Sequence, residues 1–269
     1  MIAEIGGHRF EWGRRTHVMG IVNVTPDSFS GDGLGDDQDA AVAQGLQMVA
    51  DRADMLDVGG ESTRPGHVPI TVEEEIARTE EVVRRLAKES GVPVSIDTYK
   101  LEVAEAAVAA GATILNDIWG LERAPGLAEL AARQGCAMVL MHNQDGTTYA
   151  GDLMAEIKRF LRHSVDAAIA AGVMRERILV DPGIGFGKTA DQNWEVMRRL
   201  GELRELGQPV LVGTSRKSFI GKLLDLPVTD RIAGTAATVT ASILRGADVV
   251  RVHDVREMMR VVRVADRMR

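Results

Sequence analysis

The sequence has a single cysteine, Cys136, which excludes an internal disulfide bond. A chain without disulfides suits a reducing compartment, and we predict a cytoplasmic location. Cys136 begins an apolar run that ends at Leu140, so we expect its thiol to lie in the core. No base stands near it in the sequence, and this argues against a nucleophilic role.

Aromatic residues are also scarce, at 4% of the chain, and dense clusters of Lys and Arg are absent. Acidic residues outnumber Lys and Arg by 39 to 32, which gives a net charge of −7. Binding of nucleic acids needs clustered cations or aromatic stacking platforms. The sequence therefore predicts no nucleic-acid partner.

Long hydrophobic runs are missing as well. No apolar stretch reaches the roughly 18 residues that a membrane helix needs, and the N-terminus lacks the basic-then-apolar pattern of a secretory signal. We expect no membrane association. The remaining composition, 45% hydrophobic and 26% charged over 269 residues, is that of a globular protein. This length suits one large α/β barrel or two smaller domains.

Eight short apolar runs alternate with longer amphipathic segments. Such near-continuous hydrophobic runs are typical of parallel strands that are covered on both faces. They span residues 17–24, 55–58, 93–97, 113–118, 137–141, 178–181, 209–212 and 248–252.

The segments between these runs carry apolar stripes at helical spacing. Thr71-x-x-Glu74 predicts a capping box before one of them, and Gly246 is expected at a helix C-cap. Three stripes are formed by Val42, Leu46, Val49 and Ala53, by Val72, Ile76, Thr79, Val83 and Leu86, and by Ile232, Ala236, Val239 and Ile243.

Eight strand–helix units predict the α/β class and a (β/α)8 TIM barrel. A doubly wound sheet is the alternative, but it usually has fewer strands and a glycine fingerprint after the first, and none follows Val24. Residues 1–16 predict a short N-terminal β-hairpin ahead of a barrel at 17–269. Because no linker or low-complexity segment interrupts the chain, we expect a single domain over residues 1–269.

Polar or charged residues stand where each predicted strand ends. In a barrel these ends form one rim, which carries the active site. A single such residue usually caps a turn or a helix, but eight at the same end predict a functional site. The segments are 23–30, 57–66, 95–98, 116–117, 141–142, 181–183, 213–218 and 251–254.

The rim residues fall into chemical groups. Asp97, Asn116 and Asp181 suit the edge of a polar heterocycle that carries N–H donors. Asn23 suits a metal ion or an anion, and Mg²⁺ often arrives with the phosphates of its substrate. No HExxH or paired CxxC signature of zinc occurs. Cations or donors suited to a phosphate or a carboxylate are Arg64, Lys217, Arg251 and His253.

The segment DPGIGFGKT, residues 181–189, has the look of a nucleotide phosphate loop. That pattern requires glycine five positions before Gly187, where Pro182 stands, and the dinucleotide fingerprint requires glycine where Lys188 stands. Both nucleotide hypotheses fail by one residue. We therefore predict a strand-end carboxylate, Asp181, followed by a tight turn, with Lys188 as a loop or helix-start residue.

Taken together, the motifs resemble those of the dihydropteroate synthase family, in that family's order and spacing from about residue 17 to the C-terminus. The GGESTRPG and SRKS motifs are highly specific in combination. The motifs are NVTPDSFS at 23–30, GGESTRPG at 59–66, SIDT at 95–98, ND at 116–117, DPGIGFGK at 181–188, SRKS at 215–218 and RVHD at 251–254.

The resemblance implies a step of folate synthesis. Members of the family join 6-hydroxymethyl-7,8-dihydropterin diphosphate to 4-aminobenzoate, and release diphosphate and 7,8-dihydropteroate. The resemblance also implies two small-molecule substrates, a Mg²⁺ cofactor and a homodimer.

By residue, the resemblance implies three subsites, with Asp97, Lys217, Arg251 and His253 as the catalytic residues. The pterin is held by Asp97, Asn116, Asp181 and Lys217. The diphosphate is held by Asn23, Thr63, Arg251, His253 and Asp32, with Asn23 as the metal ligand. The 4-aminobenzoate is held by Arg64, Pro65, Phe186 and Ser218.

The physical chemistry agrees with this division. Diphosphate leaves readily once a metal with Arg251 and His253 neutralises its charge, and its departure produces a pterin methylene cation in an SN1-like step. A buried carboxylate such as Asp97 would stabilise that cation. Ser218, at the expected start of a helix, suits the aminobenzoate carboxylate.

Two departures from the family pattern leave alternatives open. Gly31 is inserted in the first loop, so Asp36 or Asp37 is an alternative to Asp32, and the fifth loop lacks a second methionine after His142. A pterin-dependent methyltransferase, with the same barrel, is one alternative function. A non-catalytic pterin-binding paralogue is another.

Overall fold

The computed structural model describes residues 1–24, 38–62 and 68–269. Eight parallel strands run in the order β8-β7-β6-β5-β4-β3-β10-β9, and a parallel bridge from Val180 to Val210 joins the two outer strands. The sheet therefore closes, which confirms the predicted (β/α)8 barrel. The strands are β3 (His17–Asn23), β4 (Met55–Gly59), β5 (Val94–Asp97), β6 (Ile114–Asp117), β7 (Ala137–Met141), β8 (Ile178–Asp181), β9 (Leu211–Val212) and β10 (Val249–Val252).

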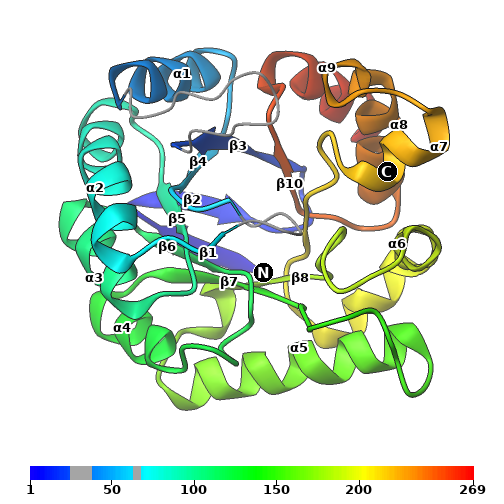
Figure 1. Cartoon of the computed structure of the whole chain (residues 1–269), viewed down its shortest axis with the longest axis horizontal. Helices are drawn as coiled ribbons and strands as arrows, with labels where there is room; N and C mark the ends of the chain where they lie inside the picture. The colour runs from blue at the N-terminus through cyan, green and yellow to red at the C-terminus, as the bar shows by residue number, and fades with distance from the viewer. Residues whose placement is uncertain (25–37, 63–67) are drawn as a thin grey trace.

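Helices surround the strands on the outside of the ring (Figure 1). They are α1 (Gln38–Ala50), α2 (Val72–Glu89), α3 (Leu101–Ala110), α4 (Gly126–Gln134), α5 (Leu153–Ala170), α6 (Ala190–Arg199), α7 (Ser218–Leu224), α8 (Ile232–Leu244) and α9 (Val255–Ala265), with short 3-10 turns at Arg175–Arg177, Leu200–Leu206 and Val228–Asp230.

The strands differ from the predicted runs by one or two residues at their ends, most visibly at β9. Only Leu211–Val212 is paired as a strand there. Pro209 has no N–H to donate to the sheet, although its carbonyl accepts a bond of 3.0 Å from the Val180 N–H. Asp248 precedes its strand, and its carboxylate accepts from the Val210 N–H at 3.0 Å.

The predicted N-terminal hairpin is confirmed. β1 (Ile2–Ile5) pairs antiparallel with β2 (His8–Glu11), and Gly6 and Gly7 supply the positive φ angles of the turn. Its strands lie across the middle of the ring in Figure 1. Ile5 and Phe10 pack in one cluster with Met55, Ile114 and Ala137, the last three being the first residues of their strands. The hairpin therefore closes the N-terminal end of the barrel.

The hairpin packing leads to a stability prediction. Phe10 is 3% exposed, so Phe10→Ala should lower the free energy of unfolding by about 3 kcal/mol, the usual loss for a buried aromatic ring. Urea titration of this variant and of the exposed Arg9→Ala control measures the difference. KM for each substrate should stay unchanged. The hairpin lies at one end of the barrel, and the carboxyl ends of the strands, which carry the predicted site residues, lie at the other. A loss no larger than that of the control would contradict this packing.

The predicted helix caps and apolar stripes are confirmed in part. Thr71 caps α2 by accepting from the Glu74 N–H at 3.2 Å, but the Glu74 carboxylate pairs with Arg78, so the reciprocal half of the capping box is absent. Gly246 lies just beyond α8 with φ +99°, as expected near a C-cap. Ile232 was predicted on the apolar stripe of α8, yet its side chain is 40% exposed.

Cys136 is buried as predicted, and burial raises the pKa of its thiol to about 11. This thiol therefore stays protonated at neutral pH and is a core residue. Over the described ranges, no helix combines the length and the apolar character needed to cross a membrane.

Candidate active site

Four side chains from four strands are joined at the carboxyl rim of the barrel. The Asn116 amide nitrogen donates to Asp57 Oδ2 at 2.9 Å. Arg251 donates from Nε to the same Asp57 oxygen at 2.5 Å and from Nη2 to Asp97 Oδ2 at 2.8 Å. The structure thus brings together Asp97, Asn116 and Arg251, as the sequence predicted, around Asp57.

Asp57 lies in the predicted rim segment 57–66, but no role in the site was predicted for it from the sequence. Its side chain is fully buried, and a buried carboxylate is costly unless it is paired. Arg251 supplies the charge and Asn116 a further hydrogen bond. The available signal was a lone acidic residue inside the apolar strand MLDVG, where a charge requires a partner from another strand.

The cluster leaves acceptors available for a ligand. Because the Asn116 nitrogen is used by Asp57, its Oδ1 is the atom left to accept from a bound molecule. Within the described ranges, Asp57 Oδ1 and Asp97 Oδ1 are buried and have no hydrogen-bond partner. Unpaired buried acceptors are costly, so this arrangement favours a ligand that brings N–H donors.

Burial also shifts the pKa values of two acidic residues of the site, Asp97 and Asp181. It raises the pKa of Asp97 above the ordinary value, with Arg251 opposing that rise and Asp57 adding to it. It raises the pKa of Asp181 to about 6, against the hydrogen bond from the Gly183 N–H and the charge of Lys217. Carboxyl groups poised near neutral pH in a polar cluster are typical of functional sites.

Lys217 and Phe186 meet beside Asp181. The Lys217 ammonium lies 4.2 Å from the centroid of the Phe186 ring, a cation–π contact. A Cβ at Gly185 would lie 3.1 Å from the Lys217 side chain, so this glycine allows the lysine to pass close over the loop. Residues assigned to the pterin and the aminobenzoate are therefore adjacent.

Ser215 holds His253, a partner that the sequence reasoning did not single out. Its hydroxyl lies 2.9 Å from His253 Nδ1 and accepts from the His253 main-chain N–H at 3.1 Å. Next to it, Arg216 has φ +55° and forms an ion pair with Asp254. These contacts tie the SRKS loop to the end of β10, where Arg251 also originates.

Asn23 ends β3 beside Gly59. A Cβ at Gly59 would lie 3.8 Å from Asp97 Oδ2 and 4.0 Å from Asn23 Oδ1, so the glycine keeps space open between the two oxygens. Ser218 begins α7 as predicted, and its side chain is exposed. Several predicted residues lie outside the described ranges: Asp32, Asp36, Asp37, Thr63, Arg64 and Pro65.

Lys188 lies in the loop directly before the N-cap of α6, as predicted, but its side chain turns inward. It is 8% exposed, and its ammonium lies 3.0 Å from each of three acceptors: His142 Nδ1, the Gly183 carbonyl and the Phe186 carbonyl. The Lys188 side chain therefore belongs to the packed interior next to the loop that follows Asp181. A local loop pattern does not show that a lysine turns inward, because the histidine it meets is distant in the sequence.

A second buried ionic network lies on the β4 side of the rim. The Lys100 ammonium is 2.7 Å from Glu61 Oε2, from Glu75 Oε2 and from the Ile70 carbonyl. Tyr99 donates to the other Glu61 oxygen at 2.8 Å. The network links the segments that follow β4 and β5.

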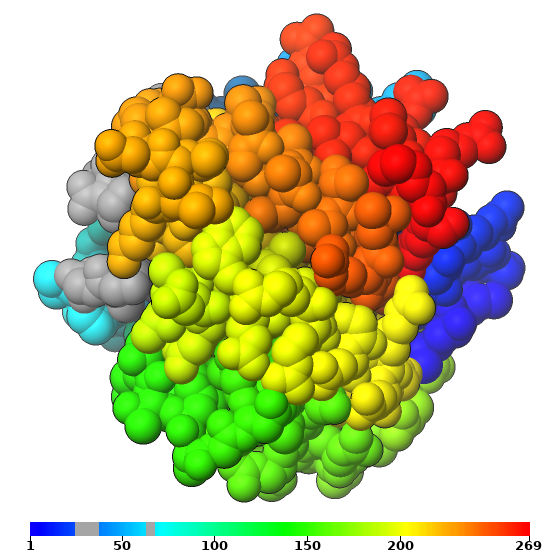
Figure 2. Space-filling model, turned by 90° about the vertical axis from the view of Figure 1, so that its right-hand side faces the viewer, coloured from blue at the N-terminus to red at the C-terminus, as the bar shows by residue number. Residues whose placement is uncertain are grey.

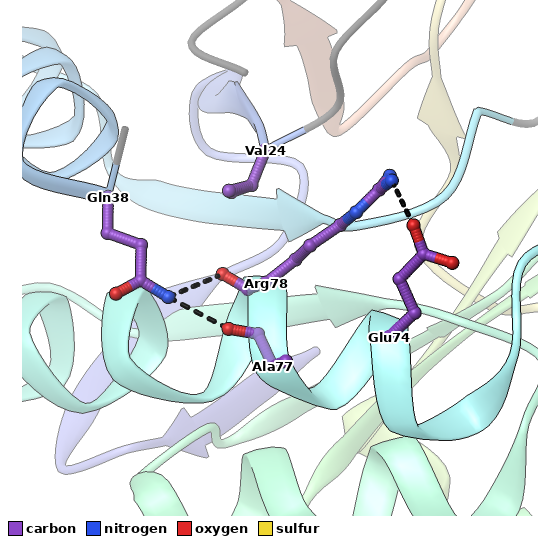
Figure 3. A pocket seen from close by; sticks show the side chains of 5 residues that line it. All are labelled: Val24, Gln38, Glu74, Ala77 and Arg78. Carbon is purple, nitrogen blue, oxygen red and sulfur yellow. Dashed lines mark hydrogen bonds and ion pairs between the residues drawn. The ribbon is translucent and has the colours of Figure 1, made fainter. Parts of the chain in front are cut away.

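A pocket opens between the end of β3, α1 and α2 (Figure 3). The Gln38 amide closes one side of it by donating to the Ala77 carbonyl at 2.8 Å. Among the residues that the structure describes, none of the predicted site residues lines this pocket, whose described walls are Val24, Gln38, Glu74, Ala77 and Arg78. The polar cluster on the strand ends, rather than this hollow, identifies the candidate active site.

Comparison with known proteins points the same way. The chain matches the family described as pterin binding enzyme over residues 19–253. It is 48% identical to the dihydropteroate synthase of Clostridium beijerinckii, with 98% of both chains covered. It is also 48% identical to the dihydropteroate synthase of Bacillus subtilis, with 94% of this chain and 89% of the relative covered.

Solved structures are similar over nearly the whole chain. A dihydropteroate synthase from Clostridium difficile, determined in the presence of pteroic acid, has 47% identity and a TM-score of 0.92, covering 96% of this chain and 98% of the other. The Xanthomonas albilineans dihydropteroate synthase in complex with 7,8-dihydropteroate has 40% identity and a TM-score of 0.89, covering 100% and 98%.

Proposed function

The chain belongs to the pterin binding enzymes and, among them, to the dihydropteroate synthases, and we propose from this premise how its residues carry the reaction. The reaction joins 6-hydroxymethyl-7,8-dihydropterin diphosphate to 4-aminobenzoate and releases diphosphate. The observation that carries the assignment of residues is the buried cluster of Asp57, Asp97, Asn116 and Arg251, whose unpaired acceptors suit a ligand with N–H donors.

The pterin is assigned to Asp97, Asn116, Asp181 and Lys217. The first three present acceptors for the N–H groups of the pterin, and the orientation that Asp57 imposes on the Asn116 amide supports this role. Lys217 donates to an acceptor atom of the ring system. The methyltransferase alternative requires the same pterin contacts, but the curated relatives at high identity are synthases.

The diphosphate is assigned to Asn23, Arg251 and His253, together with Thr63 and Asp32. Arg251 binds its two carboxylates through Nε and Nη2, which leaves Nη1 for the diphosphate. Ser215 fixes the ring of His253 by its contact with Nδ1, and this supports the assignment of His253 to the diphosphate.

Asn23 would hold the Mg²⁺ ion. The described residues contain no group of three His, Cys, Asp or Glu that could hold a metal. Mg²⁺ does not require such a group, because it commonly binds one or two protein oxygens together with phosphate oxygens and water. The space that Gly59 leaves beside Asn23 Oδ1 fits this chemistry. When bound, the ion would neutralise charge on the leaving diphosphate.

The reaction follows an SN1-like course. The bond between the pterin methylene carbon and the diphosphate oxygen breaks with its electron pair going to diphosphate, whose charge Arg251 and His253 neutralise. Asp97 stabilises the methylene cation that remains. The aminobenzoate nitrogen then attacks this carbon, and its extra proton passes to diphosphate or water.

The 4-aminobenzoate is assigned to Phe186, Ser218, Arg64 and Pro65. Phe186 lies beside the pterin-binding Lys217, which supports a position next to the methylene carbon. The exposed hydroxyl of Ser218 offers a donor for the carboxylate.

Complementation tests the function as a whole. A bacterial strain that lacks its own synthase should grow without added folate products when it expresses this chain, and should not grow with the Asp97→Asn variant. Failure of the unmodified chain to support growth, despite normal expression, would favour a protein that binds pterins without turning them over.

A homodimer is proposed through α7 and α8, which lie side by side on the face shown in Figure 2. Three large apolar side chains on these helices are exposed: Leu223 by 65%, Leu224 by 43% and Ile232 by 40%. Exposed large apolar side chains on two neighbouring helices favour an association site.

The dimer prediction is tested by mass in solution. Light scattering should give twice the chain mass of 29.1 kDa for the unmodified protein and the single mass for the Leu223→Lys, Ile232→Lys double variant. Met174→Lys, an equally apolar exposed position away from these helices, should leave the dimer intact. A double variant that remains dimeric would contradict this interface.

A further inference from the structure

Lys188 has no role in the mechanism above, yet its side chain is buried, which is rare for a lysine. Its ammonium has three N–H donors, and three acceptors surround it at 3.0 Å: His142 Nδ1 and the carbonyls of Gly183 and Phe186. Each donor therefore has one partner, and the polar atoms of this side chain are fully satisfied. Such a match between donors and acceptors indicates a built contact.

His142 is suited to accept from this ammonium. Burial first, and then the charge of Lys188, lowers the pKa of His142 to about 3, so its ring is neutral at physiological pH. The neutral ring offers Nδ1 as an acceptor when its proton is on Nε2. The His142 main-chain N–H also donates to the Asp181 carbonyl at 2.9 Å, which joins β7 to β8 at this level.

The contact fixes the loop that follows β8. Gly183 has φ +69°, and a Cβ there would lie 1.9 Å from the His142 carbonyl, so the loop presses directly against the end of β7. The Gly183 N–H donates to Asp181 Oδ1 at 2.7 Å. The Lys188 ammonium binds the carbonyl of this same glycine, so it holds the turn that orients the Asp181 carboxylate.

The Lys188 ammonium also fixes the part of the loop that carries Phe186. It binds the Phe186 carbonyl, and the Phe186 ring is the one over which the Lys217 ammonium lies. Lys188 thus connects His142 on β7 with both Asp181 and Phe186. The charge of Lys188 also acts on Asp181, because burial raises the pKa of that carboxyl while Lys188 is one of the cations that lower it. Burial lowers the pKa of Lys188 itself to about 7, so the ammonium carries its charge in the acid range where Asp181 titrates.

We propose that Lys188, with neutral His142 as its acceptor, is a positioning residue that sets the orientation of Asp181 and Phe186 and supplies part of the positive charge facing Asp181. The proposal rests on the function proposed above, because Asp181 and Phe186 are there the residues that meet the pterin and the aminobenzoate. Lys188 touches neither substrate in this account and acts through the loop.

The test replaces Lys188 with Met, which keeps the length of the side chain and removes its charge and donors. We expect KM for the pterin diphosphate to rise by about tenfold or more, since small displacements of substrate-positioning groups have large effects. We also expect the pKa of the Asp181 carboxyl, followed by NMR with carbon-13-labelled aspartate, to move upward, because a cation that lowered it is gone. Lys88→Met, on the exposed end of α2, is the matched control.

Further variants separate charge from packing. Lys188→Arg keeps the charge and should hold the Asp181 pKa near its original value, whereas Lys188→Gln keeps donors without the charge and should raise it. If Lys188→Met does not fold, the pKa in Lys188→Gln decides the question. A folded Lys188→Met protein with an unchanged KM, or an unchanged Asp181 pKa, would overturn the proposal.

The two proposals can fail separately. The Asp181 pKa is read from the protein alone, without turnover. An unmodified protein that forms no dihydropteroate would contradict the proposed function whatever the NMR titration shows. An active unmodified protein whose Lys188→Met variant is indistinguishable from it would contradict only the role of Lys188.

Discussion

The Asp97→Asn variant should lose about 100-fold or more in kcat, on the scale of removing a group that stabilises charge in a transition state. The substitution keeps the shape of the side chain and its place beside Arg251. It removes the negative charge that would face the pterin methylene cation. Because the diphosphate is bound elsewhere, its affinity should fall far less than turnover does.

The pH dependence of kcat/KM provides a second test of the role of Asp97. Burial raises the pKa of Asp97, so the carboxyl becomes protonated at a higher pH than an exposed aspartate would. Activity should therefore decline as the pH falls through the upper part of the acid range. Asp97→Asn should weaken that dependence and leave the part that belongs to Asp181, whose pKa is also raised. Asp166→Asn, exposed on α5, controls for the change in net charge. Unaltered turnover in Asp97→Asn would rule out its role in stabilising the cation.

The Arg251→Met variant should have the largest combined effect. It leaves the buried carboxylates of Asp57 and Asp97 without the cation that both now contact. Breaking a buried ionic network from one side costs about 3–5 kcal/mol of stability. It also raises the pKa of Asp97 further, because the charge of Arg251 opposes that rise. We expect kcat/KM to fall by about 1,000-fold through loss of diphosphate neutralisation.

A double variant distinguishes folding from catalysis. Adding Asp57→Asn to Arg251→Met removes one of the two uncompensated charges, so urea titration should show part of the stability restored. Activity should stay low, because no group replaces the guanidinium at the diphosphate. Recovery of full activity together with stability would mean that Arg251 serves only to balance Asp57.

Some of this site was predictable from the sequence because it depends on short-range periodicity. Asn116 and Asp181 end apolar runs, and parallel strands place such ends at one rim. Their partners were not predictable in the same way. Arg251 reaches Asp57 across 194 positions in the chain, and that pairing exists only once β10 lies beside β3 and the barrel closes.

Lys188 and Ile232 are two further residues whose burial or exposure the local sequence pattern did not predict. Glycines around Lys188 indicated a turn correctly, but its inward direction depends on His142, which is 46 positions away. Ile232 fits an apolar stripe by spacing, yet it is the first residue of α8 and its side chain is exposed. Periodicity predicts which residues share a face, and long-range packing decides what that face meets.

The most direct test of the account is a stoichiometry measured on the purified protein with both substrates and Mg²⁺. One diphosphate should be released for each 7,8-dihydropteroate formed, and the rate should be about 100-fold lower in Asp97→Asn under the same conditions. Release of diphosphate without dihydropteroate, or methyl transfer from a methylated folate in place of either product, would contradict the proposed function.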